Sequence, residues 1–269
     1  MDGTTVGVNT IPSIASPTPG APALEKGLDI LEALADEPVG LTQKAIAERV
    51  GRSVGEIFRM LGVLERRGYV TRDLPSGQYR LTLRLFDLAH RNPPTRLLLQ
   101  AAQGEMERLA NKIDQACHLV GLHGSRIVVM AQSQPERQLM GWAVRVGASF
   151  PLSVKFASAR VLAAFQRPDR RAELIARMHE EDQAASPSDL RARLEQIAER
   201  GFEMAPSEVA QGVIDISTPI IDHAGWAVAA LTVAAVFKPA SAQSSGDILE
   251  PIKRAADSIS LAIGGTVTR

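Results

Sequence analysis

The chain of 269 residues contains a single cysteine, Cys117. One thiol excludes an internal disulfide framework and a cysteine-rich zinc site. Such low cysteine use is compatible with a reducing compartment, and we expect a cytoplasmic protein.

Long apolar runs are also lacking, because no stretch approaches the roughly 20 apolar residues that a membrane-spanning helix needs. Residues 1–22 are rich in Thr, Ser, Pro and Gly, and they have neither the basic start nor the apolar stretch of a secretory signal. We therefore expect a disordered tail over 1–22 and no membrane partner.

The chain has no net charge, since 30 basic side chains balance 30 acidic ones. The charges are unevenly distributed, however. From Lys44 to Arg80 there are eight Lys or Arg residues against four Asp or Glu residues, a local net charge of +4. A basic segment of this kind favours contact with nucleic acid.

Three short helices are predicted near the start of the chain. Apolar residues recur at helical spacing from Leu24 to Leu34. Thr42 is positioned to cap a second helix, and Ser53 a third, with Glu56 in the capping-box position.

A β-hairpin is predicted directly after these helices. The stretches 69–72 and 78–82 alternate in polarity, and the turn sequence Asp73-Leu-Pro-Ser-Gly77 lies between them. Three helices followed by a hairpin is the order of elements in a winged helix.

The spacing between the second and third helices is typical of a helix-turn-helix. Ala47 is small enough for two crossing helices to approach closely, and Gly51 follows where the turn favours positive φ. Ile57 and Met60 then supply the inward face of the third helix. The sequence therefore predicts a DNA-binding domain.

We expect the third helix to enter the major groove, where arginine can make bidentate contacts to guanine, and the wing to contact phosphates. The predicted DNA-binding residues are Gln43, Lys44, Arg52, Ser53, Glu56, Arg59, Arg66, Arg67, Gln78 and Arg80. Two alternatives stay open at this point. One is that Glu56 completes the capping box and does not contact DNA. The other is that this domain binds protein, because winged helices also act as protein-interaction modules.

The rest of the chain mixes strands and helices, which indicates an α+β domain. The predicted strands are 118–122, 126–132, 139–146, 213–221 and 226–236. The predicted helices are 158–165, 170–178, 188–200 and 246–263, preceded by a connector with a short helix over 83–90 and a longer one over 96–114.

The sequence resembles the IclR-type bacterial transcriptional regulators from Leu24 to Ile263. The resemblance is carried, in order, by Leu24-Glu-Lys-Gly-Leu-Asp-Ile-Leu, Ser53-Val-Gly-Glu-Ile-Phe-Arg-Met-Leu, Arg67-Gly-Tyr-Val, Gln78-Tyr-Arg-Leu, Val144-Arg-Val-Gly, Gly212-Val-Ile-Asp-Ile-Ser and Ala229-Ala-Leu-Thr-Val. Arg59 occupies the position of the family's typical recognition-helix arginine.

This resemblance implies a GAF-like effector-binding domain with an antiparallel sheet. It also implies a homodimer formed through the DNA-binding domains, often a dimer of dimers, on a pseudo-palindromic operator. The expected organisation is a tail over 1–22, a winged helix-turn-helix domain over 23–82, a helical linker over 83–114 and the effector-binding domain over 115–266.

The resemblance also implies where a small organic effector binds. The effector-binding residues so expected are Cys117, Val120, Trp142, Val144, Phe150, Phe156, Ser158, Val213, Asp215, Thr232 and Ala234. The segment Lys155-Phe-Ala-Ser-Ala-Arg160 departs from the family's Thr-Ala-Ser-Gly-Arg, which leaves the class of ligand open.

We expect a regulator, a repressor rather than an activator, in which effector binding alters the connector and thereby the separation of two recognition helices. No cofactor is expected. An enzyme is disfavoured because Cys117 and His118 are adjacent on a strand and point to opposite faces. A metal sensor or a redox sensor through Cys117 remains an alternative, although His118, His123, His179 and His223 lack the spacing of a metal site.

Overall fold

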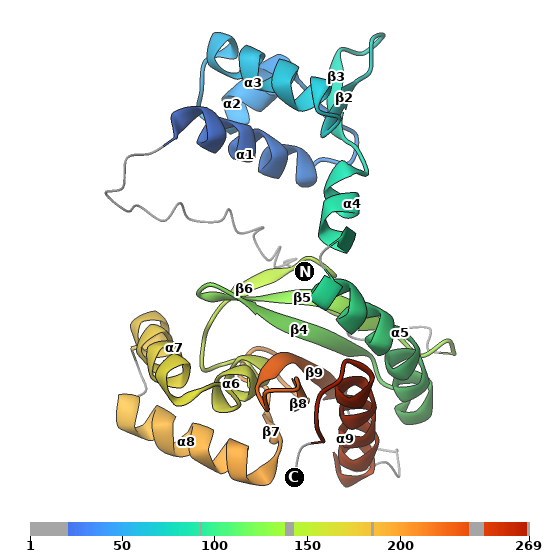
Figure 1. Cartoon of the computed structure of the whole chain (residues 1–269), viewed down its shortest axis with the longest axis vertical. Coiled ribbons are helices and arrows are strands. Elements are labelled where there is room, and N and C mark those ends of the chain that lie inside the picture. The colour runs from blue at the N-terminus through green and yellow to red at the C-terminus, as the bar shows by residue number, and fades with distance from the viewer. Residues whose placement is uncertain (1–20, 92, 138–142, 184–185, 237–244, 268–269) are drawn as a thin grey trace. The chain divides into compact units, whose positions relative to one another are not determined.

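The structure is a computed structural model, and it describes residues 21–91, 93–137, 143–183, 186–236 and 245–267. The chain divides into two compact units, Met1–Arg91 and Asn92–Arg269. Figure 1 shows both units and the order of their elements along the chain.

The first unit contains the predicted three helices and hairpin. Its elements are α1 (Pro22–Ala35), β1 (Leu41–Thr42), α2 (Gln43–Arg49), α3 (Val54–Arg66), β2 (Val70–Arg72), β3 (Gln78–Leu81) and α4 (Arg84–Arg91). The strands form an antiparallel sheet in the order β1-β3-β2. The two-residue β1 was not predicted, because it is too short to show an alternating pattern.

One apolar cluster holds this unit together. Ile30 and Leu34 of α1 pack with Ile46 of α2, Ile57 of α3 and Tyr79 of β3, and each is at most 4% exposed. The predicted turn is also present. Gly51 has φ of +63°, and the Arg52 amide donates to the Ala47 carbonyl at 2.9 Å. This turn fixes the start of α3 relative to α2.

The second unit is built on a six-stranded antiparallel sheet. Its elements are α5 (Pro93–Ile113), β4 (Cys117–His123), β5 (Arg126–Ser133), β6 (Ser149–Pro151), α6 (Ala157–Ala164), α7 (Pro168–Asp182), α8 (Pro187–Arg200), β7 (Glu203–Pro206), β8 (Val213–Ile221), β9 (Ala227–Val236) and α9 (Ser245–Ala262). The strand order is β6-β5-β4-β9-β8-β7. The predicted α+β fold with an antiparallel sheet is confirmed.

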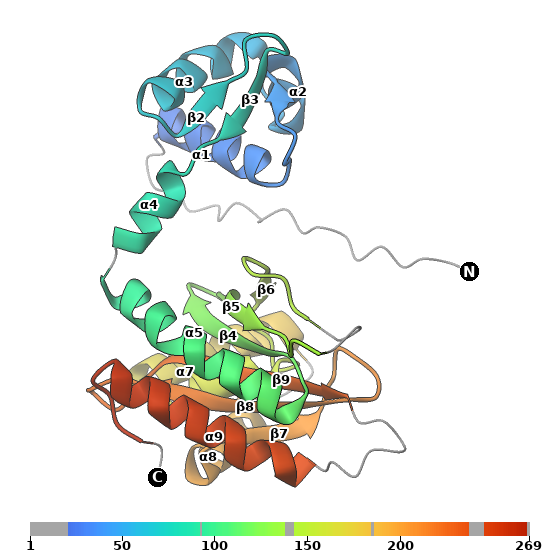
Figure 2. The ribbon, with the colours of Figure 1, turned by 90° about the vertical axis from the view of Figure 1, so that its right-hand side faces the viewer.

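Helices cover both faces of this sheet. Figure 2 shows α5 and α9 side by side in front of it, whereas α6, α7 and α8 lie on the other side. Met106 of α5 and Ile252 of α9 belong to one buried cluster, and Leu162 of α6 and Leu174 of α7 belong to a second. Side chains of one strand therefore alternate between two cores.

Two strands of this unit differ from what the sequence predicted. The predicted strand 139–146 lies partly outside the described residues, and its described part, 143–146, is irregular. The strand of this region is instead Ser149–Pro151, which pairs with β5. The edge strand β7, Glu203–Pro206, was not predicted, because four residues ending in proline give little alternation.

Candidate DNA-binding helix and effector-binding face

The start of α3 is held by a complete capping box. The Glu56 amide donates to Ser53 Oγ at 3.3 Å, and the Ser53 amide donates to Glu56 Oε2 at 2.9 Å. Lys26 of α1 adds an ion pair to Glu56 Oε1 at 3.0 Å. The hydrogen bond from the Ser53 backbone, helped by Lys26, lowers the pKa of Glu56 to about 2. Glu56 therefore has an internal role that accounts for its position without DNA.

The outer side of α3 is exposed and basic. Ile57 and Leu61 are buried against the core, whereas Arg59 and Arg66 are exposed on the opposite side, seven residues apart. Arg67 follows as the C-cap residue. Within the part of the chain that the structure describes, no hydrogen bond or ion pair engages the guanidinium groups of these three arginines. They are available to an external anion.

The other predicted DNA-binding residues contact the protein itself. Gln43 Nε2 donates to the Val54 carbonyl at 3.3 Å, and Lys44 Nζ lies 3.8 Å from Glu48. Arg52 lies 3.8 Å from Asp29, and Arg80 Nε donates to the Val39 carbonyl at 2.6 Å. Gln78 pairs with Thr42 in the sheet. The side chains of Gln43, Arg52 and Arg80 thus bridge neighbouring elements, that of Lys44 contacts its own helix, and the pairing of Gln78 is through its backbone.

A row of polar residues crosses the sheet of the second unit on the side of α6. Each of five neighbouring strands contributes one residue to this row, and each residue lies directly opposite the next. In order across the sheet they are Gln132, His118, Thr232, Ser217 and Glu203. Opposite residues on neighbouring strands point to the same face. We call these five residues the polar row, and the side of the sheet that they share the α6 face.

Two members of the polar row are joined side by side at its centre. The hydroxyl groups of Ser217 and Thr232 lie 2.8 Å apart, and both residues are buried. His118 lies next to Thr232, and burial of its imidazole lowers its pKa to about 4. His118 is therefore neutral near pH 7 and offers one donor and one acceptor. His118 was not among the residues expected to bind the effector, because its position beside Thr232 depends on the pairing of strands far apart in the sequence.

An ion-pair network lies at the Glu203 end of the polar row. Arg160 of α6 is 1% exposed, and its Nε donates to Glu203 Oε2 at 2.9 Å. Glu208 lies 3.7 Å from Arg160 and 3.6 Å from Arg193 of α8. Burial lowers the pKa of Arg160, and Glu203 opposes that shift. The guanidinium of Arg160 is thus already matched by carboxylates of the chain.

Asp215 lies near this network. Burial raises the pKa of Asp215, while a hydrogen bond from the Ser207 side chain and the charge of Arg160 act in the opposite direction. Ile214 and Ile216 beside it belong to the cluster under α5 and α9, so Asp215 faces the other way, onto the α6 face.

Most residues that the sequence assigned to an effector site lie on this face. Phe150 and Phe156 pack against the α6-side cluster with ring centroids 5.3 Å apart. The others are Val120, Ser158, Val213, Asp215, Thr232 and Ala234. Val144 lies in irregular chain, and Trp142 lies outside the described residues.

Cys117 is separated from these residues by the sheet. Its thiol donates to the Met106 carbonyl of α5 at 3.5 Å, and its side chain belongs to the cluster under α5 and α9. Val120, three positions along the strand, belongs to the opposite cluster. The expectation that both residues bind the effector at one site is therefore corrected by strand alternation, which directs them to opposite faces of the sheet. Burial also raises the pKa of Cys117 to about 12, so the thiol is not ionised near pH 7.

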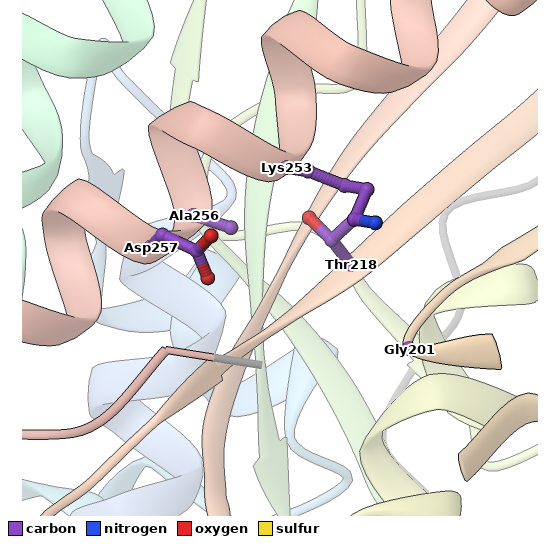
Figure 3. A pocket seen from close by; sticks show the side chains of 5 residues that line it. All are labelled: Gly201, Thr218, Lys253, Ala256 and Asp257. Carbon is purple, nitrogen blue, oxygen red and sulfur yellow. The ribbon is translucent and has the colours of Figure 1, made fainter. Parts of the chain in front are cut away.

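A shallow hollow lies on the other face of the sheet. Figure 3 shows Lys253, Ala256 and Asp257 on α9, with Thr218 of β8 and Gly201 nearby. The hollow has a volume of about 160 Å³, part of which is open to solvent. The Thr218 hydroxyl has no hydrogen-bond partner among the described residues. None of the predicted effector-binding residues lines this hollow.

Metal-binding clusters and membrane-spanning helices are both absent from the described residues. Among those residues, no three His, Cys, Asp or Glu side chains are grouped so that they could hold a metal ion. No helix within the same ranges has both the length and the apolar character needed to cross a membrane.

Models of two protein families match the chain. The IclR helix-turn-helix domain matches residues 23–74, and the domain described as bacterial transcriptional regulator IclR C-terminal matches residues 95–261. The first match spans α1 to β2, and the second spans the sheet of the second unit and its helices.

Individual proteins agree with these matches. The chain is 28% identical to the HTH-type transcriptional regulator KdgR of Escherichia coli over 213 residues, which cover 77% of this chain and 80% of that one. It is 23% identical to the DNA-binding transcriptional repressor YiaJ of Escherichia coli over 254 residues, which cover 92% and 90%.

A solved structure has the same fold. It is an IclR homolog from Microbacterium hydrocarbonoxydans complexed with 4-hydroxybenzoate, with a TM-score of 0.73, 21% identity, and coverage of 90% of this chain and 98% of that one. The chain belongs to the IclR family, and it is a DNA-binding transcriptional regulator with a C-terminal effector-binding domain.

Proposed function

We propose that this protein is a cytoplasmic repressor that binds a pseudo-palindromic operator as a homodimer and responds to a small organic effector bound on the α6 face. The observation that carries the proposal is the division of polar groups between the units. Arginines that have no hydrogen-bond or ion-pair partner among the described residues gather on α3 of the first unit, and the hydrogen-bonding side chains of His118, Thr232 and Ser217 gather on one sheet face of the second. The similarity to YiaJ favours repression.

For DNA, we assign base contact to Arg59 and phosphate contact to Arg66 and Arg67. Exposure and the lack of a partner within the described residues support this choice. Gln43, Lys44, Arg52, Gln78 and Arg80 take supporting phosphate contacts, since their hydrogen-bonding capacity is only partly used. Ser53 and Glu56 act by capping α3.

For the effector, we assign the polar contacts to His118, Thr232 and Asp215, and the apolar walls to Phe150 and Phe156. A neutral imidazole, a hydroxyl and a carboxyl group lie on the same sheet face as an aromatic pair, and this combination suits a small, partly apolar molecule with a hydroxyl or another polar end. Arg160 does not serve as the anion partner, because Glu203 and Glu208 already neutralise it.

The homodimer is supported by apolar side chains at the end of the first unit. Leu83 is 80% exposed directly before α4, and Leu85 and Leu88 on α4 are 37% and 38% exposed. Apolar residues grouped in this way favour a protein interface. In the proposed mechanism, effector binding changes α4 and α5, which follow one another along the chain, and thereby the spacing of two α3 helices.

The experiment combines operator binding with a ligand panel. Purified protein bound to DNA from upstream of its own gene is titrated with uncharged hydroxylated aromatic compounds, and with 4-hydroxybenzoate and aliphatic hydroxy acids as the anionic comparison. An effector should change operator affinity about 5- to 150-fold. Thr232→Val should abolish this response and leave the ligand-free operator affinity unchanged, whereas Cys117→Ala should retain the response.

Two results would contradict the proposal. If an active compound acted equally on wild type, Thr232→Val and Asp215→Asn, the effector would bind away from the α6 face. If the protein remained monomeric at operator-binding concentrations in sedimentation velocity, the homodimer would be wrong.

A further inference from the structure

The exposed side of α3 carries one feature that its arginines do not explain, the aromatic ring of Phe58. Phe58 is 62% exposed and belongs to no part of the apolar cluster of its unit. Its neighbour Ile57 is fully buried in that cluster. A large aromatic residue directed into solvent beside Arg59 points to contact with something outside the unit.

Two glycines accompany Phe58 and Arg59 on this side of the helix. Gly55, Phe58, Arg59 and Gly62 follow the spacing i, i+3, i+4 and i+7, which places them on one stripe. Apart from proline, glycine is the weakest helix former, and neither glycine has positive φ. No atom lies within 4 Å of a Cβ added at Gly55 or Gly62. Packing inside the unit therefore does not require a glycine at either position.

Glycines of this kind allow another surface to approach the helix backbone closely. The approaching surface must also carry a charge opposite to that of the stripe. Arg66 continues the stripe after Gly62, and neither Arg59 nor Arg66 has an ion-pair partner among the described residues. A polyanion with a groove wide enough for a helix fits these properties, and the major groove of DNA is such a groove.

Within that groove, one base presents an apolar group. Thymine carries a C5-methyl, whereas guanine, adenine and cytosine present no methyl group in the major groove. We propose that Phe58 packs against the methyl group of a thymine in each operator half-site, next to a base pair read by Arg59. Phe58 is then a specificity-determining residue. This inference rests on the proposed placement of α3 in the major groove.

The test removes one methyl group at a time. Operators are first selected in vitro from random DNA with the full-length wild-type protein. Each thymine of the selected half-site is then replaced by deoxyuridine, which pairs identically but lacks the methyl. We expect one position at which this replacement weakens wild-type binding by about fourfold, the change expected for one buried methyl-sized group.

A double-mutant cycle assigns the effect to Phe58. Phe58→Ala should bind the thymine and deoxyuridine operators equally, and Phe58→Leu, which remains apolar, should keep part of the difference. Leu74→Ala is the matched control, because Leu74 is 84% exposed in the turn of the wing and lies outside α3. This variant should retain the full fourfold preference.

Three outcomes overturn the inference. In the first, the wild type is indifferent to deoxyuridine at every thymine. In the second, Phe58→Ala keeps the wild-type preference at the sensitive thymine. In the third, Phe58→Ala dissociates the oligomer in sedimentation velocity while the thymine preference persists, which would place Phe58 in a protein interface. If the wild type selects no operator at all, the placement of α3 in the major groove fails together with the inference.

Discussion

Arg160 on α6 and Glu203 on β7 form an ion pair with 2.9 Å between Nε and Oε2, and both residues are less than a tenth exposed. Removing one partner leaves the other charge buried without compensation. Arg160→Leu should therefore lower the free energy of unfolding of the second unit by about 3–5 kcal/mol.

The matched control for this pair lies on α7. Arg177 and Glu173 form an exposed ion pair at 2.6 Å, and Arg177→Leu should cost less than about 1 kcal/mol. The double variant Arg160→Leu, Glu203→Leu should recover part of the loss in thermal unfolding. Equal stability of Arg160→Leu and Arg177→Leu would contradict the assigned burial.

His118 should make stability depend on pH. Its pKa is lowered from 6.5 to about 4 in the folded protein, so the unfolded chain binds a proton more readily. Above pH 6.5 His118 is neutral in both states and does not lower the free energy of unfolding. As the pH falls from 6.5 toward 4, the unfolded chain takes up the proton first, and the free energy of unfolding decreases by about 3 kcal/mol in total. His118→Gln should flatten this part of the pH profile measured by urea unfolding. An unchanged profile would show that His118 titrates normally.

Ser53 should contribute to the stability of α3 through its side chain. Ser53→Ala removes the acceptor for the Glu56 amide and should cost about 1 kcal/mol in the first unit. Ser53→Thr preserves a hydroxyl that accepts from the Glu56 amide and donates to the Glu56 carboxylate, and it serves as the control, with most of the stability retained. Circular dichroism melts of both variants measure the difference, and equal melting temperatures for wild type and Ser53→Ala would contradict the capping role.

Cys117 should be unreactive in the folded protein. Its thiol is buried and its pKa is raised to about 12, so little thiolate forms at pH 8. Iodoacetamide labelling followed by mass spectrometry should be complete in urea and minimal without it. Rapid labelling of the native protein would revive a redox role for this residue.

The positions of the regular elements were largely predictable because their periodicity is strong. The strand predicted at 213–221 coincides with β8, and the helix predicted at 188–200 begins one residue after the observed start of α8. The caps at Thr42 and Ser53 followed from residue type alone. The strand predicted at 139–146 was not found in its described residues, because apolar alternation there does not reflect pairing.

The candidate effector face was less predictable, because it depends on register between distant strands. His118 and Ser217 join the polar row only because β9 lies between β4 and β8. The separation of Cys117 from Val120 was predictable, since residues three apart on a strand point to opposite faces. The Arg160–Glu203 pair joins residues 43 positions apart, and no local pattern indicates it.

The most direct test of the account is fluorescence anisotropy on an operator selected with the wild type, with a scrambled duplex beside it, over a salt series. The wild type should prefer the operator by about 10³-fold or more, and its affinity should fall steeply as salt rises. Arg59→Ala should lose most of that preference, while Arg191→Ala, an exposed arginine of α8, should keep it. If Arg59→Ala kept the wild-type preference, α3 would not read the operator through Arg59, and the central claim would be wrong.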